Sequence, residues 1–242
     1  MNVIIYTLIM THITSVCFSL YVHRGIAHKS IQFNPIVEHT IRFCLWLTDG
    51  TQVKEWIAMH RRHHQFADCI EDPHSPVLCN TLREKLVFIW KNFYYSVVYR
   101  YRSFAPDYEI EFYGKGTPLD WVERNVYIPY QRIGLLLMLA INIMLFGWLG
   151  IIVWIVQLLW TPFWITIVIT TGAHQIGYHN PKADDHSKNL MPWGIIIGGE
   201  ELHSNHHADP KNPKFSKHWA EFDIGWVYVK ILMMFRLAKI KQ

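Results

Sequence analysis

Long runs of apolar residues without charge predict membrane-spanning helices. Residues 3–22 carry no acidic or basic side chain. At about 1.5 Å rise per residue they are long enough to cross a hydrocarbon core of about 30 Å. A second apolar block, residues 133–172, is about twice as long and is interrupted mainly by Asn142, Gln157 and Pro162. We therefore predict three spans, at 3–22, 133–152 and 154–173, with a turn near residues 147–150.

The basic residues indicate how these spans are oriented. No Lys or Arg occurs between Arg132 and Lys182, so all basic residues fall on one side of the three-span arrangement. Cytoplasmic flanks hold such charge. We predict an all-α membrane protein of one domain, 1–242, whose segments 23–131 and 174–242 form a cytoplasmic helical cap. The shorter apolar stretch 34–49 predicts an interfacial or re-entrant helix rather than another span.

Composition agrees with a membrane protein that has a substantial water-facing part. The chain is 51% hydrophobic, 15% aromatic and 17% charged, which is too apolar for an ordinary soluble domain. Its net charge of +4 follows from basic cytoplasmic segments, so we expect no nucleic-acid partner. Neither a basic segment before residue 3 nor a small-residue cleavage site after residue 22 supports a signal peptide. The four cysteines lack the C-x-x-C spacing of a zinc ribbon or a redox dithiol.

Histidines at a repeated spacing predict a metal site. His60-x-x-His63-His64 and His203-x-x-His206-His207 lie about 140 residues apart, and His23 and His28 form a third cluster. Positions i, i+3 and i+4 share a helix face, so each H-x-x-H-H box is expected to aim three imidazoles at a common point. His23 and His28 would diverge by about 140° on an ideal helix, so they either approach different metals or lie where the helix loosens.

The number and setting of these histidines favour two metal ions. Eight imidazoles exceed the three or four ligands of one zinc, although imidazole alone does not select the element. A site open to lipid chains, whose C–H bonds are unreactive, favours a non-haem di-iron centre that uses oxygen. Taken alone, the basic run 60–64 would also fit a surface facing lipid head groups. Six further histidines have no partner at ligand spacing and are expected in supporting or surface positions: His12, His39, His74, His179, His186 and His218.

At this point the sequence resembles a known family. The segments His23-Arg-Gly-Ile-Ala-His28, Glu55-Trp56-x-x-x-His60-Arg-Arg-His63-His64 and Gly199-Glu-Glu-Leu-His203-Ser-Asn-His206-His207 resemble the three histidine boxes of membrane fatty acid desaturases. The likeness is to the Δ9 acyl desaturases and their bacterial relatives. It implies four transmembrane helices under a cytoplasmic cap, two iron ions, and oxygen-dependent insertion of a cis double bond into a long acyl chain. The metal ligands that it implies are His23, His28, His60, His63, His64, His174, His203, His206 and His207.

Three departures from that family bear on the chemistry. One span precedes His23 where the family has a helical hairpin, so either the N-terminus is trimmed or the topology has three spans. Thr170 stands where the family has an asparagine that supports one iron through water. Ala58 and Met59 replace an Arg-Asp pair that helps animal stearoyl-CoA desaturases to bind coenzyme A. The acyl carrier therefore stays open between acyl-CoA, acyl carrier protein and phospholipid.

The resulting expectation is an oxidoreductase that acts on paired donors and reduces oxygen to water. It would lie in a bacterial inner membrane among its lipids, with the site facing the cytoplasm. Lacking haem, flavin or nicotinamide signatures, it would need a separate electron donor resembling ferredoxin, rubredoxin or cytochrome b5. Arg61, Arg62 and residues 230–241 form either its docking face or a head-group contact. The alternatives are a related di-iron hydroxylase and a non-enzymatic metal-binding or transport protein, although residues 133–172 lack the mid-membrane charges expected of a transporter.

Overall fold

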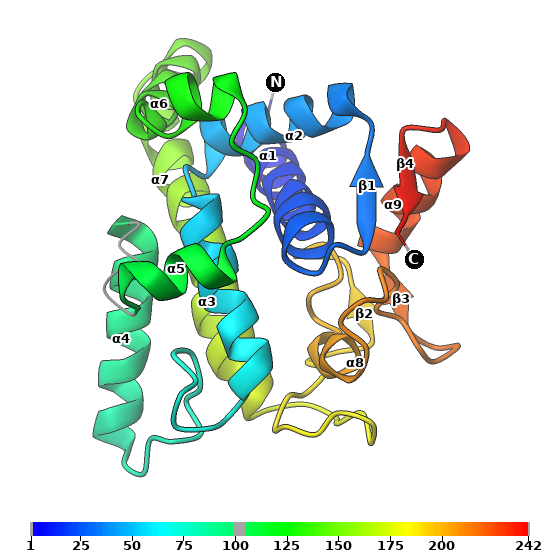
Figure 1. Cartoon of the computed structure of the whole chain (residues 1–242). Coiled ribbons are helices and arrows are strands. Elements are labelled where there is room, and N and C mark those ends of the chain that lie inside the picture. Colours follow the sequence, from blue (N-terminus) through cyan, green and yellow to red (C-terminus); the bar gives the residue numbers. More distant parts are fainter. Residues whose placement is uncertain (1, 99–104, 242) are drawn as a thin grey trace.

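Two long helices run through the molecule, and each carries, near its C-terminal end, histidines that the sequence predicts to bind metal. The computed structural model describes residues 2–98 and 105–241. In it α1 (Val3–Cys17) continues into η1 (Phe18–Ala27), and α7 (Leu149–Pro162) continues through η4 (Phe163–Thr171) to η5 (Gly172–His174). Val3–Ala27 and Leu149–His174 are the two continuous helices in this described part that are long and apolar enough to cross a membrane. They pack together through α1 and α7 (Figure 1).

The helix α6 (Gln131–Phe146) precedes α7 and packs against it. Its 16 residues make it shorter than the span expected at 133–152. The chain turns at Gly147, whose φ of +58° is in the region that favours glycine, so α7 begins at Leu149 and not near residue 154. The turn thus lies where the sequence predicts it. The predicted boundary between the second and third apolar helices, at residues 152–154, lies too late in the sequence. Two long apolar helices and one shorter apolar helix therefore take the place of the three similar stretches that we expected.

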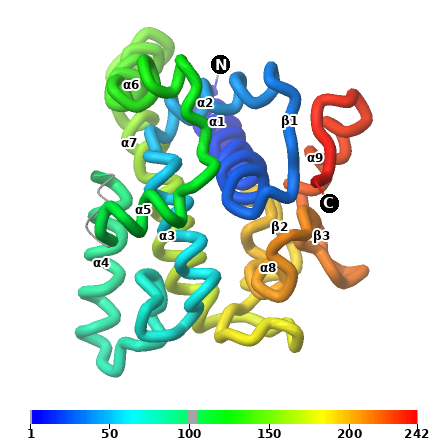
Figure 2. Tube along the Cα trace, in the orientation of Figure 1, coloured from blue at the N-terminus to red at the C-terminus, as the bar shows by residue number. Residues whose placement is uncertain are grey.

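The remaining elements surround the two long helices, with α2 resting on α1 and α6, and α4 alongside α7 and η4 (Figures 1 and 2). Strand β1 pairs with β4 in an antiparallel arrangement, and β2 pairs with β3 in a parallel one. These elements are β1 (Ile31–Phe33), α2 (Pro35–Thr48), α3 (Val53–Phe66), α4 (Leu82–Val98), α5 (Asp107–Tyr113), η3 (Glu123–Tyr127), β2 (Trp193–Gly194), α8 (His203–Ala208), β3 (Phe222–Asp223), α9 (Ile224–Met234) and β4 (Ala238–Ile240).

Both long helices loosen from α-helical to π-helical geometry in their second halves. The change occurs at Phe18 in the first helix and at Phe163 in the second. In the second it directly follows Pro162, which has no amide hydrogen and so cannot continue the α-helical bonding pattern. A π-helical turn closes i→i+5 hydrogen bonds and therefore changes which side chains share a face. This local change matters most in η1, where it sets the positions of His23 and His28.

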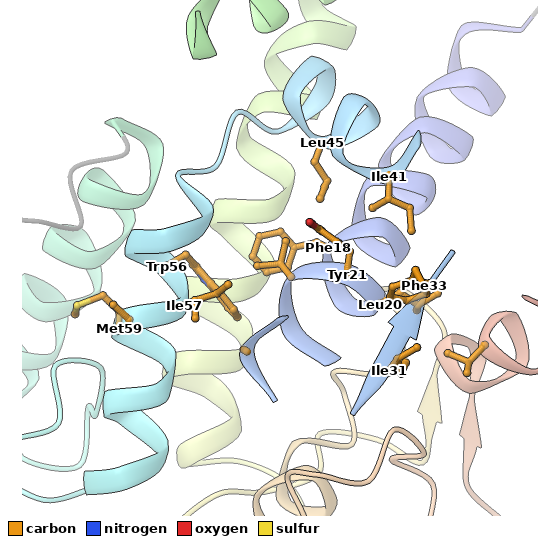
Figure 3. Packing of buried hydrophobic residues seen from close by; sticks show 14 of the residues in the cluster. Phe18, Leu20, Tyr21, Ile31, Phe33, Ile41, Leu45, Trp56, Ile57 and Met59 are labelled. Carbon is orange, nitrogen blue, oxygen red and sulfur yellow. The ribbon is translucent and has the colours of Figure 1, made fainter. Parts of the chain in front are cut away.

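The main apolar cluster lies where η1 passes between α2 and α3. Figure 3 shows Phe18 and Tyr21 of η1 with Leu45 of α2 on one side and Trp56 of α3 on the other. The rings of Phe18 and Trp56 meet edge to face, with their centroids 4.8 Å apart. Offset and edge-to-face aromatic pairs are favourable geometries, worth about 0.5–1.5 kcal/mol beyond burial alone. This packing fixes α3 against η1 and so positions the histidines of both helices.

A buried polar network joins the apolar helices at their other end. The Tyr6 hydroxyl donates to Asn142 Oδ1 at 2.9 Å, and Asn142 Nδ2 donates to Gln157 Oε1 at 2.8 Å. These three side chains come from α1, α6 and α7 and are buried. Interhelical hydrogen bonds of this kind contribute about 0.6 kcal/mol each in a membrane protein. Two of the three residues that interrupt the second apolar block, Asn142 and Gln157, therefore have a structural role.

Close packing of α6 on α7 depends on Gly150. A β-carbon at this position would lie 2.2 Å from the Asn142 carbonyl oxygen. We expect Gly150→Ala to destabilise the protein by roughly 1–3 kcal/mol, because the helices must separate to admit the methyl group. Thermal unfolding in detergent measures this effect. Gly172→Ala is the control, since its nearest contact would be an ordinary 3.5 Å; equal melting temperatures for the two variants would contradict the packing argument.

Candidate metal centre

The nine histidines expected to bind metal come together in two adjacent groups. Within each group the nitrogen atoms lie within 4.8 Å of one another. The five-histidine set contains His23, His28, His60, His64 and His206, and the four-histidine set contains His63, His174, His203 and His207. These residues come from η1 and its end, α3, η5 and α8, which are far apart in sequence.

The π-helical turn explains why His23 and His28 belong to the same set. The amide of His28 donates to the carbonyl of His23 at 3.1 Å, which is the i→i+5 bond of this geometry. Residues five apart then lie near one another on a single face, and the two rings are 4.8 Å apart. The two imidazoles therefore belong to one group of histidines, and the loosened helix is the arrangement observed.

The two H-x-x-H-H boxes do not each point at one centre as expected. His60 and His64 belong to the five-histidine set, whereas His63 points into the other. The second box shows the opposite division: His203 and His207 lie in the four-histidine set and His206 in the five-histidine set. The reason is geometric, since i and i+4 differ by about 40° around a helix while i+3 lies about 60° on the other side. Each box thus supplies ligands to both sets and holds them close together.

Carboxylates orient several of these imidazoles through Nδ1. Glu200 lies 2.7 Å from His23 Nδ1, and Asp72 lies 2.8 Å from His63 Nδ1. Asp68 lies 3.1 Å from His174 Nδ1. A fourth carboxylate, Asp185, contacts His207 Nδ1. A carboxylate on one ring nitrogen fixes the tautomer and the ring orientation, and it makes the other nitrogen a better ligand. Three of the four acceptors serve the four-histidine set.

The inward-facing nitrogens form a set of donors that suits a cation. With Nδ1–H directed at a carboxylate, Nε2 presents a lone pair to the centre of the group. His174 Nε2 and His203 Nε2 are 3.1 Å apart, and His23 Nε2 and His206 Nε2 are 3.0 Å apart. His207 Nε2 is buried and has no hydrogen-bond partner among residues 2–98 and 105–241. Lone pairs that converge in a buried space are stabilised by a shared metal ion, so the residues fit the metal that the sequence predicts.

Burial keeps most of these imidazoles neutral, the form in which histidine binds metal. Desolvation, followed by neighbouring imidazoles, holds the pKa of His64, His203 and His206 well below the usual value. Burial also lowers the pKa of His207 to about 4, against the raising effect of Asp185. His63 is the exception, because the hydrogen bond and charge of Asp72 outweigh desolvation and raise its pKa.

One surface loop supports much of the four-histidine set. Asp68 and Asp72 belong to the segment that follows α3, and Asp72 also accepts the amides of Asp68 and His74. His74 Nδ1 lies 3.1 Å from Asn92 Oδ1 on α4, so the loop is attached to that helix. We infer that α4 and this loop together hold His63 and His174 in place, through the two aspartates.

A small apolar pocket of about 40 Å³ lies against the histidines. Phe18, Trp56, Ile165 and Ile169 form much of its wall, with His23, His60, His63 and His203 at one side. The Trp56 indole stacks on the His60 imidazole, with ring centroids 4.7 Å apart. Thr170 and His74 also line it, which places the threonine that replaces the family's asparagine beside the four-histidine set. The pocket therefore borders histidines of both sets.

A larger cavity of about 310 Å³ lies on the other side of η1 and the start of α3. Val22 and Glu55 border it, whereas their neighbours His23 and Trp56 border the small pocket. Its walls are mainly apolar, and the buried Arg42 guanidinium stands among them. Arg42 is held by Asp120 and by Glu123, the latter at 2.7 Å. The small pocket and the larger cavity therefore lie on opposite sides of η1 and the start of α3.

The histidines that belong to neither set lie at the surface or bond to other side chains and backbone groups. His39, His186 and His218 are exposed, and His12 Nε2 lies 3.1 Å from the Tyr228 hydroxyl. His179 Nδ1 lies 2.9 Å from the Ser187 carbonyl oxygen.

The four carboxylates that contact the imidazoles, Asp68, Asp72, Asp185 and Glu200, were not identified as functional residues from the sequence. Glu200 occurs in a segment that resembles the family, but its pairing with His23 depends on a contact distant in sequence.

Comparison with known proteins agrees with this site. A sequence model of the family described as "Fatty acid desaturase" matches residues 1–229. The chain is 28% identical to Delta-9 acyl-lipid desaturase 1 of Arabidopsis thaliana over 89% of this chain and 67% of that protein. It is 28% identical to sn-1 stearoyl-lipid 9-desaturase of Synechocystis sp. over 90% and 64% of the two chains. The sn-2 palmitoyl-lipid 9-desaturase of Nostoc sp. is 30% identical over 93% and 76%. The chain thus spans about two thirds of the length of the first two relatives.

Removing the charge of Asp72 tests the support of the four-histidine set. We expect Asp72→Asn to weaken binding of one of two Fe²⁺ equivalents by about 10–100-fold, because His63 loses its charged partner. Anaerobic titration of the metal-free protein with Fe²⁺ measures both affinities. The neighbouring exposed Glu71 provides the control, Glu71→Gln. If both equivalents keep wild-type affinity in Asp72→Asn, the proposed support is absent.

The lowered histidine pKa values predict acid-sensitive stability of the metal-free protein. For His207 the folded pKa of about 4 lies below the usual 6.5, so unfolded chains bind more protons between these values. Stability is therefore lost as pH falls from about 6.5 towards 4, by about 2 kcal/mol for this group at pH 5. His63, with a raised pKa, opposes the trend, but several histidines contribute in the direction of His207. Metal-free protein should unfold at a lower temperature at pH 5 than at pH 7.5; the reverse order would refute this.

Proposed function

Because this chain belongs to the fatty acid desaturase family, we propose that it introduces a cis double bond into a long fatty acyl chain, at the Δ9 position. The observation that carries the proposal is the pair of histidine sets beside an apolar pocket. The named acyl-lipid and stearoyl-lipid relatives support an acyl substrate and the Δ9 position.

We propose that each set holds one iron ion. The ligands would be His23, His28, His60, His64 and His206 for one ion, and His63, His174, His203 and His207 for the other. Bound iron would supply the oxidising power needed to remove hydrogen from two adjacent methylenes, with oxygen reduced to water. The four carboxylates keep the imidazoles in the metal-binding tautomer. Thr170, which lines the pocket near the four-histidine set, has a hydroxyl that can hold a water there.

The pocket residues position the substrate and exclude solvent. Phe18, Trp56, Ile165 and Ile169 offer an apolar surface against the histidines, which suits methylene groups and disfavours water. Holding the reacting carbons at a fixed place lowers the entropic part of the barrier. At about 40 Å³ the pocket is narrower than an acyl chain requires, so side chains such as Phe18 must move when substrate enters.

We propose that the acyl group is carried on a membrane lipid. The relatives' names specify acyl-lipid or stearoyl-lipid substrates. Ala58 and Met59, at the positions of the coenzyme A-binding pair of animal enzymes, are buried and uncharged. The helices Val3–Ala27 and Leu149–His174 would anchor the protein in a bacterial inner membrane. The absence of Lys and Arg between residues 132 and 182 supports a site that faces the cytoplasm.

Expression in a bacterial host without its own desaturase tests this function. We expect new monounsaturated chains, with the double bond between carbons 9 and 10, in fatty-acid methyl esters from the host lipids. His206→Ala should lower this product by roughly a hundredfold or more, since it removes a proposed ligand. His39→Ala, at an exposed position on α2 outside both sets, is the control and should retain full activity. Hydroxylated chains without new double bonds would show a hydroxylase instead, and full activity of His206→Ala would overturn the ligand assignment.

A further inference from the structure

A basic surface loop covers the five-histidine set on its solvent side. Residues 209–219, here named the basic loop, follow α8 directly and expose Lys211, Lys214 and Lys217. Lys217 Nζ lies 2.8 Å from Asp209 Oδ2, and this pair, assisted by the charge of Lys182, lowers the pKa of the Asp209 carboxyl. Lys211 and Lys214 form no ion pair with any residue of the described ranges 2–98 and 105–241. The loop therefore presents uncompensated positive charge to solvent.

The inner side of the same loop touches the proposed iron ligands. The Phe215 side chain is only 1% exposed, and its ring centroid lies 4.6 Å from that of His206 and 5.7 Å from that of His23. The Arg24 guanidinium covers the same ring at 3.8 Å. The amide of Phe215 donates to Asp223 Oδ2 at 2.8 Å, so the loop is fixed in place. Phe215 therefore lies between the exposed lysines of the basic loop and two histidines of the five-histidine set, His23 and His206.

Two other basic groups near the site, Arg61 and Arg62, already have partners. Arg61 donates to the backbone carbonyls of Ala27, Ile26, Tyr113 and Lys115. Arg62 forms an ion pair with Glu109. These two arginines therefore stabilise the fold around α3 and do not offer a free docking surface. The basic loop is a surface where positive charge without an ion-pair partner lies at a short distance from the histidines.

The proposed reaction needs electrons from outside the protein. Reduction of one O₂ to two H₂O takes four electrons and four protons. Forming one double bond supplies two of each, when the two C–H bonds break. Two electrons, with two protons from solvent, must therefore come from a reductant in each turnover. A carrier protein delivers them most readily where it can approach the metals closely, because electron tunnelling falls steeply with distance.

We propose that the basic loop is the docking surface for a small acidic one-electron carrier protein. Charge complementarity between such a carrier and Lys211 and Lys214 would guide the encounter and raise the association rate. Trp219, at the end of the loop, is 92% exposed and offers the kind of aromatic contact that is common in protein interfaces. The proposal rests on the proposed function, which creates the need for a reductant.

The test measures binding of a plant-type [2Fe–2S] ferredoxin to the full chain in nanodiscs of zwitterionic lipid. Such lipid separates carrier binding from attraction to anionic head groups. We expect the double variant Lys211→Glu/Lys214→Glu to weaken ferredoxin binding by at least about tenfold, and the wild-type affinity to fall as salt is raised. The control, Lys230→Glu/Lys239→Glu, changes the net charge equally at exposed positions on α9 and β4. It should bind as the wild type does.

Equal affinities of the two double variants, or no measurable binding by the wild type, would overturn the docking proposal. The second readout is anaerobic reduction of the iron-loaded protein by reduced ferredoxin. It should slow in Lys211→Glu/Lys214→Glu, while dithionite reduces all forms alike. A loss of dithionite reduction would instead reveal damage to the metal site and overturn the assignment of these lysines to docking alone. Failure of the proposed function is distinct, because it would appear as a wild type that binds no iron and forms no unsaturated product.

Discussion

The convergence of nine buried imidazoles is the constraint on which the rest of the structure depends. Each ring must stay neutral and present its inward nitrogen as a lone pair, although lone pairs that face one another at about 3 Å repel. Burial supplies the first requirement by lowering the pKa of most of these histidines. Carboxylates on the outer ring nitrogens supply much of the second. A cation in each set removes the repulsion, so metal binding and folding are coupled.

The surrounding fold serves this arrangement at several levels. The π-helical η1 directs His23 and His28 to one set, and the 3₁₀ turn η5, which follows the π-helical η4, carries His174 in the other. Packing of Phe18 on Trp56 fixes α3, and Trp56 in turn stacks on His60. The same two aromatic side chains border the small pocket. Structural packing, ligand orientation and the proposed substrate surface thus share residues, which makes the site sensitive to changes in this part of the core.

Much of this site could be predicted from sequence, because its signals are local. Spacing located eight of the histidines, and resemblance to the family added His174. What escaped prediction depends on geometry that sequence does not display. The division of each H-x-x-H-H box between two sets arises from the angle between i+3 and i+4, and the grouping of His23 with His28 arises from a π-helical turn. The carboxylates Asp68, Asp72 and Asp185 reach their histidines across 9 to 106 residues of chain. Long apolar runs predicted the long helices but misplaced their limits around Gly147.

We propose that the chain holds two iron ions in unequal histidine environments, with five histidine ligands at one ion and four at the other. Mössbauer spectroscopy of protein loaded anaerobically with ⁵⁷Fe²⁺, combined with iron and protein quantification, tests it most directly. We expect two irons per chain and two quadrupole doublets of equal area that differ in isomer shift or quadrupole splitting. A single iron per chain, or iron that binds without any histidine nitrogen ligands, would contradict it.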